Sequence, residues 1–134
     1  MSPRAAGATQ HELSRIGLLA TLPGETLARL AQRMTREDVP AGAAVVTEGE
    51  EGDRFYVVLS GMFSVAQKSR GAQSVLRPGD YFGEVALAMR MPRTASVRAL
   101  TPATVASCDS ETFDEFIRPL FADDGSSSVP GTAP

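Results

Sequence analysis

Residues 39–65 read "VPAGAAVVTEGEEGDRFYVVLSGMFSV", a stretch that alternates short β-rich runs with glycine turns. The runs favour strands because Val, Phe and Tyr pack well on a pleated surface. Within residues 54–60, Phe55, Val57 and Leu59 share one face, since strand side chains alternate. Short strands with turns about every ten residues indicate an antiparallel sandwich or barrel.

The same pattern continues towards the C-terminus. Further β-rich runs are "QSVL" (73–76), "TASVRAL" (94–100) and "ATVASC" (103–108). Segments with helical patterns lie before and after this region. We therefore predict a mainly β fold with N- and C-terminal helices, whose centre is an antiparallel β-barrel or jelly roll (double-stranded β-helix).

Two helical segments are predicted before the strands. Residues 12–22 form the first, Pro23-Gly24 breaks it, and residues 24–34 form the second. Apolar side chains recur in the second at the i, i+3, i+4, i+7 spacing of one helix face. These side chains are Leu27, Leu30, Ala31 and Met34. We interpret this segment as a helix packed on the core.

A last helix is predicted for residues 111–120, with Asp109 or Ser110 as its N-cap. Pro119 is expected to stop or kink it, because proline pushes the preceding residue out of helical geometry. The apolar side of this helix consists of Phe113, Phe116, Ile117 and Leu120.

The chain has 134 residues, which is enough for one domain of ordinary size. Residues 1–11 are small and polar and are expected to form a flexible tail. Residues 12–120 form the domain. Residues 121–134 are rich in Gly, Ser and Pro and have little to bury, so they are predicted to be a disordered tail or a linker.

Composition excludes several classes of function. The formal net charge of −3 argues against a nucleic-acid-binding surface. Cys108 is the sole cysteine and His11 the sole histidine, so neither a disulfide nor a histidine- or cysteine-based metal site is expected. No secretion signal and no membrane-spanning run is apparent. We expect a cytoplasmic protein, or a cytoplasmic piece of one.

Residues 82–99, "FGEVALAMRMPRTASVRA", carry the candidate chemistry. Gly83 opens one or two helical turns whose first amides are unpaired and suit a phosphate. Arg93 would meet two phosphate oxygens with its planar guanidinium. Glu84 would repel the phosphate unless it accepts sugar hydroxyls and lies near Arg93. The pattern indicates a ligand with one phosphate and a ribose hydroxyl, or else a Glu84–Arg93 salt bridge with no ligand.

This segment resembles the phosphate-binding cassette of cyclic-nucleotide-binding domains, as in the catabolite activator protein, protein kinase A regulatory subunits and cyclic-nucleotide-gated channels. The family pattern is F-G-E, an aliphatic residue, a small residue, Leu, a short spacer, then R-[ST]-A-x-V. Upstream, residues 39–65 are similar to the family's first strands and its "EG…GD…FYV…SG" framework. The resemblance covers residues 12–118.

The resemblance implies roles for the cassette residues. Arg93 would pair with the exocyclic oxygens of the cyclic phosphate, and Glu84 would accept the ribose 2′-hydroxyl. The backbone of Gly83 would lie close by, and the amides around Val85 and Ala86 would point at the phosphate.

Four further positions follow from the same resemblance. Thr94 would touch the phosphate through its hydroxyl, and Ala95 would keep the pocket floor small. Val65 and Leu76 match positions that contact the purine, although both also fit a plain core. Thr94 occurs in relatives of either purine preference and does not decide between cAMP and cGMP. We favour cAMP as the commoner bacterial ligand.

The resemblance also shows a departure and leaves alternatives open. Family members usually continue into a lid helix over the base, for which Pro119 and residues 121–134 leave little room. The leading hypothesis is a sensor module, in which ligand rearranges the helices at 12–34 and 111–120 and signals to an effector domain or a homodimer. The alternative is a ligand-free interaction module with an internally satisfied Arg93–Glu84 pair. An enzyme is disfavoured, because no metal ligand set and no activated nucleophile is apparent, and no cofactor is expected.

Overall fold

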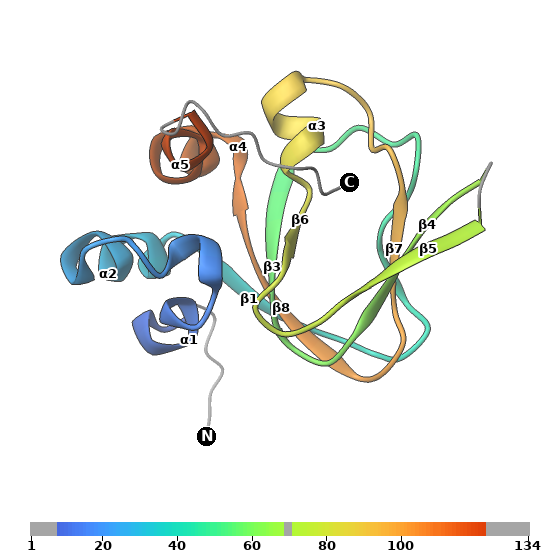
Figure 1. The fold of residues 1–134 in the computed structure, drawn as a ribbon, viewed down its shortest axis with the longest axis horizontal. Helices are drawn as coiled ribbons and strands as arrows, with labels where there is room; N and C mark the ends of the chain where they lie inside the picture. The colour runs from blue at the N-terminus through green and yellow to red at the C-terminus, as the bar shows by residue number, and fades with distance from the viewer. Residues whose placement is uncertain (1–7, 69–70, 123–134) are drawn as a thin grey trace.

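Two four-stranded antiparallel sheets form the centre of the protein, in a computed structural model that describes residues 8–68 and 71–122. One sheet has the strand order β1-β8-β3-β6 and the other β2-β7-β4-β5 (Figure 1). The strands are β1 (Thr35–Val39), β2 (Ala44–Val46), β3 (Arg54–Ser60), β4 (Phe63–Gln67), β5 (Gly71–Leu76), β6 (Tyr81–Phe82), β7 (Ser96–Ala99) and β8 (Ala103–Asp109).

This strand order is that of a jelly roll, because each sheet takes two strands from the first half of the region and two from the second. The predicted fold class is therefore confirmed. In the described part of the chain no ladder joins the two sheets. The strands consequently form an open sandwich, and not a closed barrel.

Strands β1 and β6 are absent from the sequence-based prediction. The sequence of β1 is "TREDV", and four of its five residues are exposed. It is an edge strand that pairs with β8, and most of its side chains face solvent, so its sequence shows no apolar alternation. Strand β6 has only two residues, which is too short for any alternation to be recognised.

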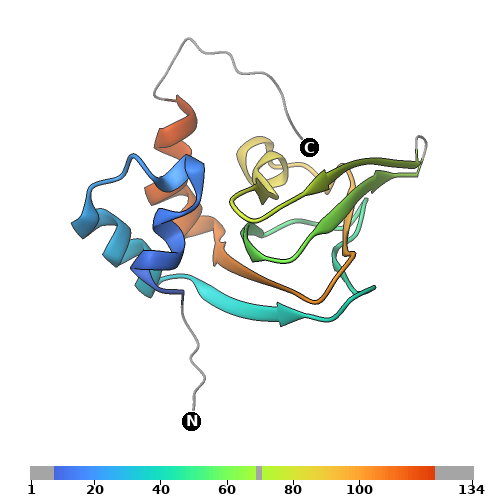
Figure 2. The ribbon, with the colours of Figure 1, turned by 60° about the horizontal axis from the view of Figure 1, so that its bottom comes forward.

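The helices are α1 (Gln10–Ser14), the 3₁₀ turn η1 (Gly17–Leu19), α2 (Gly24–Gln32), α3 (Glu84–Met89), α4 (Ser110–Thr112), the π-helical segment η2 (Phe113–Ile117) and α5 (Arg118–Ala122). Figures 1 and 2 show that the N- and C-terminal helices gather on one side of the sheets, and that α3 lies against the strands.

The N-terminal helix begins at Gln10, two residues earlier than predicted. Thr9 and Glu12 form a capping box, in which each side chain accepts a hydrogen bond from the backbone amide of the other. Residues 1–7 of the predicted tail lie outside the described residues. Residues 121 and 122 belong to α5, and the rest of the predicted C-terminal tail, 123–134, is also outside the described part.

The C-terminal helix passes through Pro119, so of the two expected effects of this proline, a stop or a kink, the stop is wrong. The five residues before Arg118 are wound as a π-helix, and α5 continues beyond it. Because proline lacks an N–H and crowds the carbonyl four residues earlier, a wider turn just before it relieves both problems. The predicted N-cap is confirmed as Asp109, whose Oδ1 accepts a hydrogen bond from the Thr112 amide at 2.9 Å.

Strand β3 separates two apolar cores. Phe55 and Val57 are fully buried against the helices, and Leu59 packs on the same cluster. Tyr56 and Val58 point the other way, into the space between the two sheets. Because both faces of β3 are covered, the alternation predicted for Phe55, Val57 and Leu59 is confirmed, although the opposite face is buried too.

The side chains on the predicted helix faces lie in the helix-side core. Leu27, Leu30, Ala31, Met34, Phe113, Phe116 and Ile117 are buried there, and Leu120 is partly buried against it. The N- and C-terminal helices are therefore packed into one layer on the outer face of the first sheet. The inner face of that sheet is turned towards the second sheet and the candidate site.

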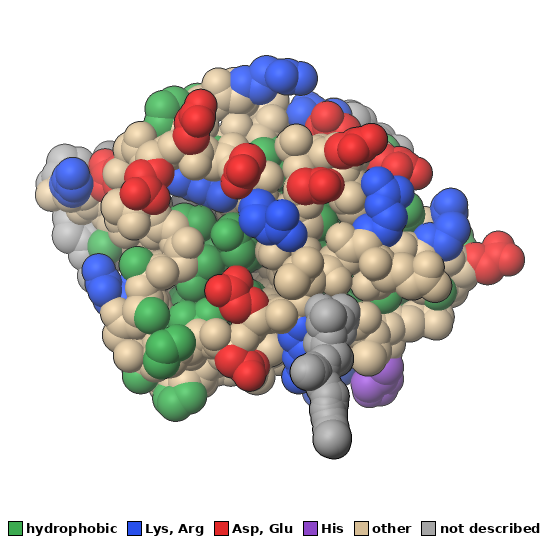
Figure 3. Space-filling model, turned by 180° about the vertical axis from the view of Figure 1, so that it is seen from behind, with side chains coloured by type: hydrophobic (Ala, Val, Ile, Leu, Met, Phe, Trp, Pro, Cys, Tyr) green, Lys and Arg blue, Asp and Glu red, His purple; other side chains and the backbone are tan. Residues whose placement is uncertain are grey.

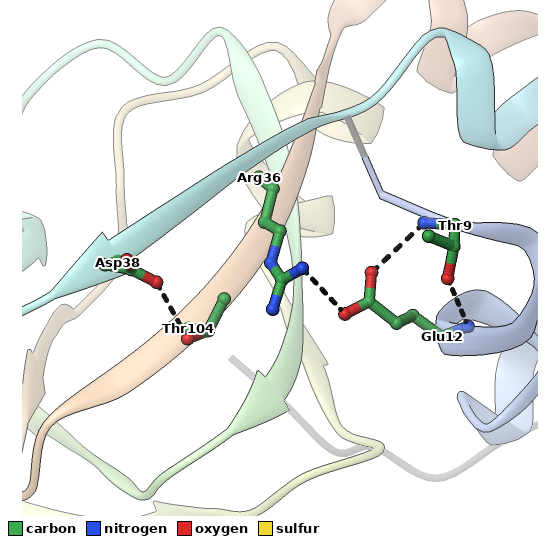
Figure 4. A network of polar contacts seen from close by, with 5 residues as sticks. All are labelled: Thr9, Glu12, Arg36, Asp38 and Thr104. Carbon is green, nitrogen blue, oxygen red and sulfur yellow. Dashed lines mark hydrogen bonds and ion pairs between the residues drawn. The ribbon is translucent and has the colours of Figure 1, made fainter. Parts of the chain in front are cut away.

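Polar contacts attach α1 to the outer strand β1 (Figure 4). Glu12 accepts a capping hydrogen bond from Thr9 and forms an ion pair with Arg36 on β1, with an Oε2–Nη1 distance of 3.1 Å. Further along the same strand, Asp38 accepts a hydrogen bond from the Thr104 hydroxyl on β8 at 3.0 Å. These surface contacts orient the helix layer, although exposed pairs each contribute only about 0–1 kcal/mol.

Charges of both signs are mixed on the face of the molecule opposite to Figure 1 (Figure 3). Acidic side chains stand beside basic ones there, around an apolar area. Within the described ranges, no helix has the length and apolarity that crossing a bilayer requires.

Candidate functional site

Gly83 connects β6 to α3 in a conformation that favours glycine. Its φ of +96° lies in the left-handed region. A Cβ at this position would lie 2.9 Å from the carbonyl oxygen of Arg54 and 2.9 Å from Nη1 of Arg93. The backbone at Gly83 is therefore in close contact with the guanidinium of Arg93.

Arg93 is buried, with 7% of its surface exposed. Its Nη2 donates to the carbonyl oxygen of Arg54 at 2.9 Å, and its Nη1 donates to the carbonyl oxygen of Gly83 at 3.3 Å. The guanidinium carbon lies 5.9 Å from the centre of the Tyr56 ring. Two backbone hydrogen bonds fix the residue itself: its amide donates to the Glu50 carbonyl, and its carbonyl accepts from the Gly49 amide.

Burial lowers the pKa of Arg93, and the nearby Tyr56, Asp53 and Glu84 partly oppose this shift. The guanidinium nevertheless stays charged, because its ordinary pKa is far above neutral pH. The site therefore contains a desolvated cation that is held by neutral carbonyls. A charge in this setting interacts more strongly with an added anion than it would on the surface.

Glu84 begins α3 directly after Gly83, and its carboxylate is poorly satisfied. Oε1 is buried and has no hydrogen-bond partner among the described residues. Burial raises the pKa of Glu84 to about 7, although its own backbone amide and Arg93 both favour the charged form. A buried acceptor with no partner is unfavourable unless a ligand donates to it.

The described residues contain no ion pair between Glu84 and Arg93 within 4 Å. The predicted alternative of an internally satisfied Arg93–Glu84 pair is thus wrong as stated. Arg93 is satisfied by two backbone carbonyls, whereas Glu84 retains an oxygen without a partner. The physical reason is that the carbonyl oxygens of Gly83 and Arg54 occupy the positions around the guanidinium at which they accept its hydrogen bonds, in place of the Glu84 carboxylate.

A hollow lies in front of Arg93, between α3 and the second sheet. Most of the cassette residues predicted from the sequence surround it. The lining consists of Gly83, Val85, Ala86, Arg93, Thr94 and Ala95, together with Val46, Phe82 and Val97. The structure thus brings the predicted phosphate-facing residues to one place, with an apolar wall beside them.

Three predicted site residues, Glu84, Val65 and Leu76, do not line this hollow. Val65 is 3% exposed and lies opposite Val97 in the pairing of β4 with β7. Leu76 is partly buried and lies opposite Phe63 in the pairing of β4 with β5. Both pack between the sheets. Their contact with a purine stays a prediction.

Several residues of the site are missing from the sequence-based prediction. Val46 and Val97 supply apolar wall, and Tyr56 stacks on Phe82 with ring centres 4.8 Å apart beneath the guanidinium. Gly52 touches Arg93 from the loop between β2 and β3. The signal available for Gly52 is its place in "EGEEGD", which indicates a turn and belongs to the "EG…GD" framework of the resemblance, but neither assigns it a contact with Arg93. The others carry the apolar pattern of ordinary strand residues.

Metal and thiol chemistry find no support in the described part of the chain. No group of three or more His, Cys, Asp or Glu side chains there is placed to hold a metal ion. Cys108 is fully buried in β8, and burial raises the pKa of its thiol to about 12. A neutral buried thiol is a poor nucleophile, so Cys108 is a core residue.

Glu84 gives the ligand-free protein a specific pH dependence. Its carboxyl has a pKa of about 7 in the folded state against an ordinary value of 4.5. Between these two values the folded state binds more protons than the unfolded state, so the free energy of unfolding falls as the pH rises. The carboxyl's favourable contribution is fully present below pH 4.5 and is lost above pH 7.

We expect the difference in unfolding free energy between wild type and Glu84→Gln to shift by about 1–3 kcal/mol across this range. The glutamine variant is the control because it keeps the shape but cannot ionise. Urea unfolding at several pH values measures both proteins. Parallel pH profiles would contradict the pKa given for Glu84.

Known proteins are similar to this chain in sequence and in fold. The family model of the cyclic nucleotide-binding domain matches residues 36–119. The cAMP-dependent protein kinase regulatory subunit of Yarrowia lipolytica is 40% identical over 109 residues, which cover 81% of this chain and 29% of that protein. A cGMP-dependent protein kinase of Caenorhabditis briggsae is 32% identical over 114 residues, covering 81% of this chain and 15% of that protein.

A solved structure agrees with these matches. The regulatory domain of Toxoplasma gondii PKA with cAMP superposes with a TM-score of 0.79 at 27% identity, covering 83% of this chain and 44% of that one. This chain spans less than a third of either kinase-related relative. The family model matches more than half of the 134 residues, and the matched range includes strands of both sheets, Gly83 and the buried Arg93. The chain therefore belongs to the cyclic nucleotide-binding domain family.

Proposed function

We propose that the hollow in front of Arg93 holds a cyclic nucleotide and that the domain is a regulatory module, not a catalytic one. The observation that carries this proposal is that the site holds two buried charged groups, Arg93 and Glu84, which differ in how well they are hydrogen-bonded. A buried guanidinium stands beside a buried carboxylate oxygen that has no donor among the described residues, and the two are not paired with each other. A ligand with a phosphate and a hydroxyl on one small ring satisfies both.

The phosphate would lie against Arg93 and the first turn of α3. Two of the five guanidinium N–H groups donate to carbonyls among the described residues, so other N–H groups remain available for an anion. The amides of Val85 and Ala86 belong to the first helical turn, where no earlier carbonyl of the helix can accept from them. The hydroxyl of Thr94, which also lines the hollow, would add a third kind of donor.

The ribose would lie against Glu84. A 2′-hydroxyl that donates to Oε1 removes the cost of an unpaired buried acceptor. The same hydroxyl favours the ionised carboxylate, which lowers its pKa again. Ligands without a hydroxyl there leave the acceptor unpaired, so Glu84 provides selectivity as well as affinity.

We assign cAMP as the preferred ligand over cGMP. The kinase regulatory subunit with 40% identity is named for cAMP, as is the Toxoplasma gondii structure, whereas the relative named for cGMP is 32% identical. The apolar wall formed by Val46, Val97 and Ala95 offers few polar groups to distinguish the purines. The preference for cAMP therefore rests on the relatives and not on a base-specific contact.

The output of the domain would pass through its helices. Arg118 in α5 donates to the Leu87 carbonyl of α3 at 3.4 Å and pairs with Asp114 at 2.9 Å. Leu87 is also part of the helix-side core. Ligand contacts with α3 would therefore favour one arrangement of the C-terminal helices over another. A kinase catalytic subunit, another effector domain or a second copy would sense that arrangement, in the cytoplasm.

Calorimetric titration with cAMP, cGMP and 5′-AMP tests this function. We expect cAMP to bind with a Kd of about 1 µM or tighter, which corresponds to about 8 kcal/mol. The open 5′-monophosphate is the matched control, because its extra charge and free geometry do not fit the same cradle. A thermal melt with cAMP at about 100 times Kd should stabilise the protein by about 2.7 kcal/mol. Flat melts and millimolar or absent binding would leave the interaction-module hypothesis in its place.

A further inference from the structure

Gly52 lies in the loop between β2 and β3, directly against the guanidinium of Arg93. A Cβ at this position would lie 2.5 Å from Nε and 2.6 Å from Cζ of Arg93. The same Cβ would lie 2.7 Å from the Cβ of Ala86 in the first turn of α3. These distances are well inside van der Waals contact. The loop, the guanidinium and the helix meet only because residue 52 has no side chain.

Backbone conformation does not explain a glycine at this position. The loop and turn glycines Gly49 and Gly83 have φ values of +90° and +96°, in the left-handed region. Gly52 is not among the residues with positive φ, so its backbone conformation is open to alanine. Space is the only feature of this position that requires glycine.

Together with three other contacts, Gly52 fixes the position of the Arg93 guanidinium. The carbonyls of Arg54 and Gly83 hold the two terminal nitrogens by hydrogen bonds, and the Tyr56 ring lies 5.9 Å from the central carbon. Gly52 approaches the remaining nitrogen, Nε, and the central carbon. Any side chain there pushes the guanidinium out of this arrangement or moves α3 with it.

We propose that Gly52 is a positioning residue for the ligand cation: its lack of a side chain sets where the Arg93 guanidinium lies relative to the first turn of α3. The effect on ligand affinity rests on the proposed function, whereas the contact itself does not. Gly52 acts through Arg93 and Ala86, and it does not line the hollow.

The first test is the affinity of Gly52→Ala for cAMP. Displacing a charged group by a few tenths of an ångström to 1 Å weakens its contacts with a bound anion, so we expect the Kd to rise about 10-fold or more. Gly17→Ala is the matched control, because nothing lies within 4 Å of its Cβ and its φ is not positive. The control should bind like wild type. An unchanged Kd for Gly52→Ala, in a wild type that binds, would overturn the proposal.

The second test needs no ligand. Thermal unfolding of wild type, Gly52→Ala, Arg93→Ala and the double variant forms a double-mutant cycle. We expect Gly52→Ala to lower Tm in the wild-type background. The part of that loss that comes from the guanidinium should disappear when residue 93 is already alanine, whereas the crowding against Ala86 remains. If Gly52→Ala does not fold, recovery of the fold by the added Arg93→Ala supports the same conclusion.

Gly52→Ala could instead lower Tm equally with arginine and with alanine at residue 93, or the double variant could be as unfolded as Gly52→Ala alone. Either result would show that the added Cβ does not crowd Arg93 and would overturn the proposal. Failure of the two ideas is thus distinguishable. If wild type binds no cyclic nucleotide, the proposed function fails, while the ligand-free cycle still decides whether Gly52 and Arg93 are coupled.

Discussion

Replacement of Arg93 by alanine is expected to weaken cAMP binding by about 2–5 kcal/mol, the cost of truncating one partner of a desolvated charge pair. Arg93 is 7% exposed and is held by the carbonyls of Arg54 and Gly83, so its charge is desolvated and fixed in position. Calorimetric titration of the variant with cAMP measures the change. This is the largest effect expected for a single side chain of the site.

Arg98→Ala is the matched control for this prediction. Arg98 lies on β7 five residues after Arg93, is exposed, and donates to the Gly42 carbonyl at 2.7 Å, away from the hollow. Its removal should leave the Kd unchanged. If Arg93→Ala, folded by circular dichroism, bound cAMP as tightly as the Arg98 variant does, the assignment of the phosphate to Arg93 would have to be abandoned.

The largest loss of stability is expected for Phe113→Ala, at about 3–5 kcal/mol of unfolding free energy. Phe113 is fully buried in the helix-side core. Its ring lies 5.4 Å from that of Phe55 on β3 and 6.4 Å from that of Phe121, and Arg118 lies over it at 5.6 Å. The substitution leaves a cavity where the C-terminal helix meets the first sheet. Urea unfolding measures the effect.

Phe121→Ala provides the comparison, because Phe121 is in the same helical region but is 40% exposed. We expect it to cost less than about 1 kcal/mol, in line with a partly exposed ring. A domain of this size has about 5–15 kcal/mol in total, so Phe113→Ala removes a large share. Similar midpoints for the two variants would show that the ring of Phe113 is not part of the cooperative core.

Much of the architecture follows from short-range pattern. The alternation of Phe55, Val57 and Leu59 predicts a strand, and the structure has β3 at Arg54–Ser60. The helix predicted at residues 84–89 is present as α3. Strand β1 escaped prediction because its "TREDV" sequence is mostly exposed, and pairing with β8 is a long-range contact that no local pattern encodes.

In the cassette too, local sequence predicts the residue types, whereas long-range contacts decide how they are paired. Gly83, Glu84 and Arg93 were predicted from their residue types and spacing, and the hollow brings Gly83 and Arg93 together with four other predicted residues. The sequence left a salt bridge between Glu84 and Arg93 open. The fold excludes it, because backbone carbonyls from Gly83 and from the start of β3 reach the guanidinium first.

The sequence by itself determined the class of strands and helices, the core face of each helix, and the chemical types gathered around residues 82–95. These properties depend on periodicity and on side-chain chemistry, which are local. Only the tertiary structure decided that Glu84 has an oxygen without a partner among the described residues, that Val65 and Leu76 pack between the sheets and do not line the hollow, and that Gly52 touches Arg93. These features depend on which distant backbone atoms occupy the available space, and chain packing alone sets that.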